Sequence, residues 1–322
     1  MEPPLIALSL AASLILPAGA QCAMSPEDKA WVEVSLSNWR VAERELLRLE
    51  PAPMPLILVA DATCVYQALP DADGRADWRS EPHHGAVPLP GGEQVPLGPL
   101  SFAAPASGDA AGFFVMTLPS VWRAAGVDSE IGLSALMDGM MLHEIMHTRQ
   151  FEFIAPKLTA LNAPDDLDDD SLQARWKDNA AYVAAFEAER DALFAAALAS
   201  DDEDARAKAA EALSLMRARR ERFFVGADAT WAAYDDIFLT MEGLGQWIAY
   251  AWYVRTRPEM TPDAIRAVVR RGGKYWSQDE GLALFLVIDR LVPGWQAYGF
   301  ATEPDFAEAL LARAAGEVRL AP

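Results

Sequence analysis

The chain has 322 residues, of which 52% are hydrophobic and 23% are charged. A chain of this length and composition buries a core as one large or two modest domains, which excludes a disordered protein. It carries 27 Lys and Arg against 47 Asp and Glu, a formal net charge of −20. Because this surplus repels phosphate backbones and anionic membrane surfaces, we expect no nucleic-acid partner.

The first 20 residues have the pattern of a signal peptide. An apolar stretch runs from Leu5 to Leu16, and Ala18-Gly19-Ala20 matches the A-x-A cleavage pattern. We therefore expect cleavage after Ala20, an exported mature chain (periplasmic or secreted) and no stable membrane span after cleavage. No Lys or Arg precedes the apolar stretch, so a misassigned start codon and a retained N-terminal anchor are the alternatives.

The two cysteines, Cys22 and Cys64, are too few for a disulfide-dense scaffold or a thiolate zinc site. In an oxidising compartment they can form one disulfide, and the alternative is two unpaired thiols.

Residues 21–128 are predicted to form an N-terminal α+β region. This part is rich in proline, with ten of the 22 prolines between Pro51 and Pro105. We expect a helix near residues 31–49 and buried strands at 55–60 and 112–118, with a turn-rich loop between the two strands.

Residues 129–322 are predicted to be a helical domain. Apolar periodicity predicts helices at 131–153, 171–199, 203–224, 230–253, 262–270 and 278–291. Residues 171–224 read as an antiparallel helical hairpin inserted into this domain. The expected fold class is therefore α+β, predominantly α, with a small N-terminal sheet layer.

An acidic run at residues 165–170 precedes the hairpin. It lacks the Gly and distal Glu of an EF-hand loop, so we favour a solvated loop that caps the next helix over a calcium site.

The segment His143-Glu144-Ile145-Met146-His147 has the form H-E-x-x-H. On a helix, positions i and i+4 share one face, so both imidazoles can bind one Zn²⁺. Glu144 then lies beside the metal, where it can act as the general base that takes a proton from water. The alternative is a pair of histidines on an ordinary helix surface.

A catalytic zinc site needs a third protein ligand. The remaining histidines, His83 and His84, lie in a Pro-rich segment that forms either a surface loop or part of a substrate cleft. A carboxylate is the more probable ligand type, and Glu242 and Glu280 both stand in Glu-Gly-Leu segments. We favour Glu242 because its predicted helix is longer and more apolar.

These two segments resemble the gluzincin metallopeptidases, in which H-E-x-x-H is followed by a helix that carries a glutamate ligand. In the aminopeptidase branch that glutamate lies in N-E-G-[FL]-[AG]-x-[YW], and residues 242–247 match it, with Met241 in place of Asn. The resemblance implies a zincin-like catalytic core and one Zn²⁺ held by His143, His147 and Glu242, with Glu144 as base. Glu242 lies 95 positions beyond His147, and no G-x-M-E-N motif is present, so aminopeptidase activity is not implied.

Two further features follow from this resemblance. The strand at 113–118 resembles the edge strand along which zincins hold extended peptides. An oxyanion donor is usually a Tyr, His or Arg that faces the metal, and Tyr250, Tyr253 and Arg255 are available on or just beyond the helix of Glu242. The sequence does not choose among these three residues.

The leading hypothesis is an exported zinc metallopeptidase that hydrolyses a peptide or protein substrate. One alternative is a zinc hydrolase of a non-peptide or cell-wall amide. Another is a helical binding protein with a structural or vestigial metal site, in which the hairpin is the interaction surface.

Overall fold

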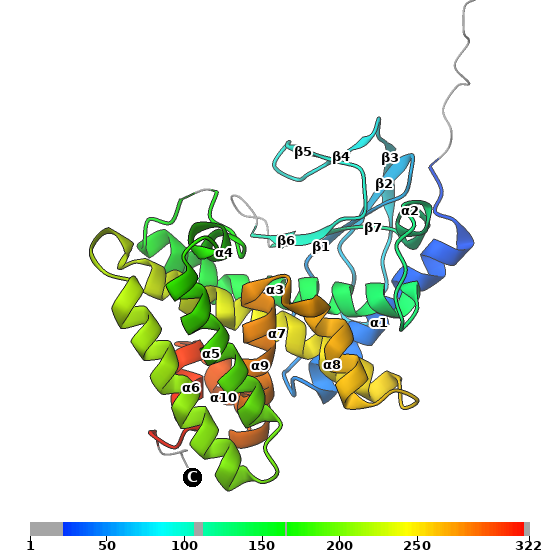
Figure 1. Cartoon of the computed structure of the whole chain (residues 1–322). Helices are drawn as coiled ribbons and strands as arrows, with labels where there is room; N and C mark the ends of the chain where they lie inside the picture. Colours follow the sequence, from blue (N-terminus) through cyan, green and yellow to red (C-terminus); the bar gives the residue numbers. More distant parts are fainter. Residues whose placement is uncertain (1–21, 106–111, 165, 319–322) are drawn as a thin grey trace, which may run out of the picture.

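The computed structural model describes residues 22–105, 112–164 and 166–318, and the predicted signal peptide, residues 1–20, lies outside these ranges. The fold is α+β and mostly helical, as predicted, with a small sheet next to a larger helical body (Figure 1). None of the helices in the described ranges combines the length and the apolar character that crossing a bilayer requires.

The main sheet has five strands in the order β3-β2-β1-β7-β6. Their bounds are β1 (Leu56–Ala60), β2 (Cys64–Ala68), β3 (Arg79–Pro82), β6 (Ser101–Ala104) and β7 (Phe113–Thr117). Strands β1 and β7 are parallel, and the other neighbouring pairs are antiparallel. A separate hairpin joins β4 (Ala86–Pro88) to β5 (Gln94–Pro96).

The two predicted strands are confirmed as β1 and β7, but the turn-rich loop predicted between them is wrong. That segment contains β2 to β6, each of three to five residues. Strands this short, separated by Pro and Gly, offer too few positions for an alternating pattern to stand out.

The prediction that residues 113–118 form an edge strand is also wrong. β7 lies between β1 and β6, and β6 is the edge. The physical reason is that β6 pairs antiparallel with β7, from Ser101 opposite Met116 to Ala104 opposite Phe113. All five residues of β7 are buried, as is typical of a strand covered on both faces.

The two faces of the sheet have different partners. Ile57, Tyr66 and Phe114 belong to the main core, which they share with the helices. Leu58 and Val115 point the other way and pack in a smaller core with Val87 of the β4–β5 hairpin. This alternation follows from the two-residue period of a strand.

The helices have these bounds: α1 (Pro26–Glu45), α2 (Pro119–Ala124), α3 (Leu133–Ala160), α4 (Ser171–Trp176), α5 (Ala180–Ala197), α6 (Asp202–Phe223), α7 (Trp231–Thr256), α8 (Pro262–Arg270), α9 (Trp276–Leu291), α10 (Gln296–Gly299) and α11 (Ala307–Ala314). The predicted helices are present, with one correction. Residues 171–199 form two helices, because the side chain of Asn179 accepts hydrogen bonds from the backbone of Ala181 and Tyr182 and so begins α5.

Helix α3 lies against strand β6 on one side and against α7 on the other (Figure 1). α7 also packs on α9. The hairpin of α5 and α6 packs on α9 and α11, so it is an integral part of the helical body. A disulfide joins Cys22, ahead of α1, to Cys64 of β2.

Candidate metal centre

His143 and His147 lie one turn apart on α3, and Glu242 lies on α7. Nε2 of His147 is 2.8 Å from Nε2 of His143 and 3.1 Å from Oε1 of Glu242. Nε2 of His143 is 3.3 Å from Oε2 of Glu242. Atoms bound at zinc distances around a tetrahedral ion are about 3.3 Å apart. The structure therefore brings together two histidines and a carboxylate that can hold a metal ion.

One oxygen of Glu242 gives an independent test of this fit. Oε2 is buried, and it makes no hydrogen bond to any described residue. A buried acceptor without a partner costs about 1–3 kcal/mol, more when it is charged, and a cation between Glu242 and the imidazoles would remove that cost. Two nitrogens and one carboxylate suit Zn²⁺. Among the described residues no further His, Cys, Asp or Glu joins the group.

The charges around His143, His147 and Glu242 favour a positive charge between these three side chains. Burial alone would raise the pKa of Glu242, but the neighbouring imidazoles hold it well below its usual range. Burial alone would lower the pKa of His147, but the carboxylate of Glu242 raises it to about 9. A bound divalent cation would supply this positive charge while both imidazoles stay neutral.

Gln150 orients His147 from the far side of the ring. Its Oε1 lies 3.0 Å from Nδ1 of His147, and its amide nitrogen donates to the backbone oxygen of Thr240 on α7. If Nδ1 carries the proton and donates to Gln150, Nε2 presents its lone pair to the site. The same amide side chain links α3 to α7 and so fixes the two helices that carry the three residues.

Two glycines after Glu242 allow the close approach of neighbouring helices. A Cβ at Gly245 would lie 2.6 Å from Nδ1 and Cε1 of His143. A Cβ at Gly243 would lie 2.7 Å from the backbone oxygen of Gly281 on α9. The two glycines of the Glu-Gly-Leu-Gly segment therefore let α7 pack closely between α3 and α9.

Glu144 does not belong to the three-residue group, but it faces the same space. With His143 it lines a cavity of about 300 Å³. Its Oε1 accepts a hydrogen bond of 2.8 Å from the hydroxyl of Ser101, on the edge strand β6. This hydrogen bond fixes the carboxylate at the cavity wall.

Several residues of this cavity were not found by sequence reasoning. Gln246, Gln278, Tyr275 and Arg271 provide its polar groups, together with Ser101. The position of Gln246, one turn after Glu242, is a signal that the sequence contains. No sequence pattern marks the other four. Ser101 comes from β6, whereas Arg271, Tyr275 and Gln278 come from the turn before α9 and the start of that helix.

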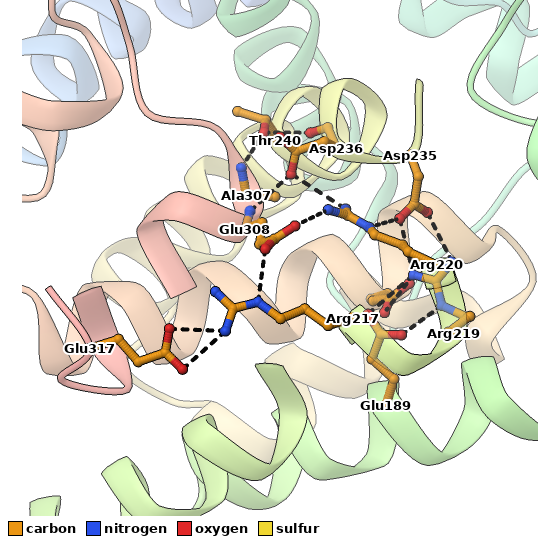
Figure 2. Close-up of polar contacts among 11 residues, drawn as sticks. Glu189, Arg217, Arg219, Arg220, Asp235, Asp236, Thr240, Ala307, Glu308 and Glu317 are labelled. Carbon is orange, nitrogen blue, oxygen red and sulfur yellow. Dashed lines mark hydrogen bonds and ion pairs between the residues drawn. The ribbon is translucent and has the colours of Figure 1, made fainter. Parts of the chain in front are cut away.

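Glu280, the rival third ligand, lies in a different buried cluster. Its Oε1 is 3.9 Å from Nη2 of Arg219. Burial, together with the nearby carboxylate of Glu189, raises its pKa well above the usual range. Arg219 of α6 is paired there with Glu189 of α5, and both Arg219 and Arg220 are paired with Asp235 of α7 (Figure 2). Its Oε1 also makes no hydrogen bond to a described residue, but Glu280 does not belong to the group of His143, His147 and Glu242.

The loop histidines do not line the cavity. His83 is buried beside the sheet, where Nε2 lies 2.9 Å from the backbone oxygen of Asp61 and Nδ1 accepts from the backbone of Gly85. His84 is exposed.

Of the three oxyanion-donor candidates, only Tyr253 lines the cavity. Its hydroxyl donates to the backbone oxygen of Leu136. Arg255 pairs with Glu45 at the surface, and Tyr250 is half-buried away from the cavity lining.

The acidic run forms a loop that leads into α4, but the predicted helix cap is wrong, because the side chain of Asp170 at the N-cap makes no capping hydrogen bond. Asp169 is half-buried rather than solvated. Within the loop, Asp168 accepts a hydrogen bond from the hydroxyl of Ser171. Asp165 lies outside the described residues, and the described acidic residues of the run form no metal-binding group.

Comparisons of the chain with protein-family models, with curated proteins and with solved structures found no match.

Proposed function

We propose that the chain is a zinc-dependent metallopeptidase of gluzincin type. One observation carries this proposal: His143, His147 and Glu242 converge, and Glu144 faces the cavity beside them. The H-E-x-x-H and Glu-Gly-Leu-Gly segments, 95 positions apart in the chain, are neighbours in the fold. This is the arrangement that the resemblance to gluzincins implies.

The composition of the group favours a catalytic over a structural site. Structural zinc sites usually have four protein ligands, whereas catalytic sites have three and keep a position open to water or substrate. Here three residues are present, and His143 opens onto a cavity that a substrate can enter. This observation also counts against a binding protein with a merely structural metal.

Glu144 supplies proton transfer in this proposal. A bound zinc ion would provide Lewis-acid activation of the attacking water and of the substrate carbonyl. Glu144 takes a proton from water and returns it to the leaving amine. Ser101 keeps the carboxylate in position, and Gln150 keeps His147 in the orientation that presents Nε2.

Strand β6 is the element to which we assign substrate alignment. It is one of the two edge strands of the five-stranded sheet, β3 being the other, and its first residue, Ser101, donates a hydrogen bond to Glu144. An extended peptide that pairs with this edge by main-chain hydrogen bonds passes beside the cavity without requiring a particular sequence. The edge role that the sequence suggested for residues 113–118 belongs to this neighbouring strand.

We place the mature protein outside the cytoplasm. The Cys22–Cys64 disulfide supports this, because disulfides persist in oxidising compartments. The signal-peptide pattern of residues 1–20 points the same way.

The test combines metal content with turnover. Elemental analysis of the purified protein is expected to find about one zinc per chain, lost in His143→Ala. A peptide library followed by mass spectrometry is then expected to reveal cleavage. Glu144→Gln should keep the zinc and lose at least 100-fold in kcat.

Glu152→Gln is the matched control, since it makes the same change at an exposed site on the same helix. It should behave as wild type. Full activity in Glu144→Gln would overturn the proposed mechanism, and absence of metal after zinc is supplied would overturn the site.

A further inference from the structure

Arg271 is a cation at the wall of the cavity beside Glu144. Among the described residues that line this cavity it is the only Lys or Arg. The residue is exposed, and its guanidinium pairs with no carboxylate among the described residues. Only its backbone N–H is bonded, to the backbone oxygen of Val268. A guanidinium has five N–H donors, so this residue is available for an anion that enters the cavity.

The backbone at this position is held in an unusual conformation. Arg271 has φ 48°, in the left-handed region, where it ends α8, and Gly272 and Gly273 follow with φ 68° and 74°. A left-handed non-glycine residue costs about 1–2 kcal/mol. Such strain persists where the surroundings fix it, and it is common at binding sites.

The preceding arginine fixes this turn. Arg270 donates two hydrogen bonds, of 2.7 and 3.1 Å, to Asp279 on α9, and its guanidinium lies over the ring of Phe194. The two adjacent arginines therefore have different roles. Arg270 anchors the turn to the helical body, and Arg271 lies at the cavity wall.

The cavity also offers apolar surface, next to the polar groups of Ser101, Gln246 and Gln278. Its lining includes Leu100, Trp122, Leu136, Met140, Val268 and Val269. A volume of about 300 Å³ is at the small end of the range for ligand pockets. It has room for a small ligand, such as an apolar side chain together with the groups bonded next to it.

We propose that this cavity binds an apolar residue next to the scissile bond, and that Arg271 pairs with a carboxylate carried by that end of the substrate. The carboxylate is the free C-terminus of a peptide or an acidic side chain. The substrate's identity as a peptide rests on the proposed function, whereas carboxylate binding does not. A local cation is needed because the chain's net charge of −20 otherwise disfavours anionic substrates.

The first measurement is binding of two small probes, N-acetyl-phenylalanine and N-acetyl-phenylalanine amide, by calorimetry. We expect the acid to bind at least tenfold more tightly than the amide, both before and after metal removal. In Arg271→Gln the two affinities should agree within twofold. Lys274→Gln is the matched control, because it removes one exposed positive charge three residues away, outside the cavity lining.

Equal binding of acid and amide by the wild type would overturn the inference. So would a preference for the acid that survives Arg271→Gln, because the carboxylate would then bind elsewhere, for example at the metal. Arg271→Lys keeps the charge and should retain part of the preference.

The second measurement is cleavage of matched peptides that end in a carboxylate, in an amide, or in an amide with a Glu side chain nearby. Faster cleavage of the first identifies the C-terminus as the carboxylate, and faster cleavage of the third identifies the side chain. In both cases Arg271→Gln should raise KM more than it lowers kcat.

If no peptide is cleaved but the acid probe still binds through Arg271, the peptidase function fails and the carboxylate site stands. If peptides are cleaved without regard to carboxylates, the function stands and this inference fails.

Discussion

Two buried glutamates with nearly the same local sequence have pKa values shifted in opposite directions. Glu242 lies against two imidazoles, which lower its pKa, so it is a carboxylate at neutral pH. Glu280 lies beside Glu189, and burial with this like charge raises its pKa well above the usual range, which favours the neutral acid. The Glu242 carboxylate can therefore bind a metal ion, whereas the neutral form of Glu280 is a poor metal ligand.

This difference predicts contrasting effects of the same substitution. Glu242→Gln should lower zinc affinity at least tenfold, because it removes the charged donor of the group. Glu280→Gln should keep about one zinc per chain and cost less than about 1.5 kcal/mol, because glutamine has the shape and polarity of the neutral acid. Zinc titration and urea denaturation of both variants measure these effects. Loss of zinc in Glu280→Gln with retention in Glu242→Gln would reverse our assignment.

The metal-free protein should also show a characteristic pH dependence. The pKa of His147 is raised from 6.5 to about 9 in the folded state. Its protonation therefore stabilises the fold fully below pH 6.5, and this contribution is lost as the pH rises toward 9. The free energy of unfolding should fall by on the order of 3 kcal/mol over this interval. Denaturation after chelation measures it.

The zinc-loaded protein is the first control for this pH dependence, because metal-bound His147 does not take up the proton. Glu242→Gln is the second, since it removes the carboxylate that raises the pKa of His147. An unchanged slope in Glu242→Gln would contradict our explanation.

At the residue scale, sequence reasoning succeeded where one element determined the geometry. His143 and His147 share a helix face because of their spacing alone. The choice between Glu242 and Glu280 depends on which neighbours tertiary packing supplies, and their local sequences do not contain that information. Arg271 and Tyr275 reach the cavity from the turn before α9, so no motif marked them.

At the scale of elements, the fit of α7 between α3 and α9 determines where Glu242 lies. Gly245 is a close contact on the side of α3, because a Cβ there would lie 2.6 Å from the ring of His143. Helical glycines ordinarily cost stability relative to alanine, so this one is retained for contact rather than for helix formation.

Gly245→Ala should therefore displace His143 and lower zinc affinity by tenfold or more. The overpacking should also cost about 1–3 kcal/mol in stability. Gly91→Ala is the control, because an added methyl group there meets open space. Zinc titration and thermal unfolding measure both effects, and wild-type zinc affinity in Gly245→Ala would show that the ring is free to move.

Helix boundaries were easier to predict than strands. Helix α8 has the predicted bounds, because Thr261 caps it and Pro262 occupies its first turn. The strands β2 to β6 were missed because each is too short to show a period. β7 was predicted as a strand, but its position inside the sheet depends on the pairing with β6, which local sequence does not reveal.

At the scale of the whole molecule, a network of buried charges joins four helices. On α6, Arg219 donates to Glu189 of α5 and to Asp235 of α7 (Figure 2). Arg220 donates to Asp235 as well and to Glu308 of α11. Asp235 lies two turns before Glu242 on the same helix. The network therefore holds the hairpin against the helix that carries the predicted third ligand.

Arg219 and Arg217 provide a matched test of this network, because both lie on α6 and both form ion pairs. Arg219 is fully buried, so Arg219→Met leaves Glu189 and Asp235 without their common partner and should cost about 3–5 kcal/mol. Arg217 pairs with Glu308 and Glu317 at the surface, so Arg217→Met should cost less than about 1 kcal/mol. Urea denaturation of the zinc-loaded protein measures both. Equal costs would show that the buried network does not anchor the hairpin, whereas the predicted difference, with weaker zinc binding in Arg219→Met alone, would link the hairpin to the metal centre through α7.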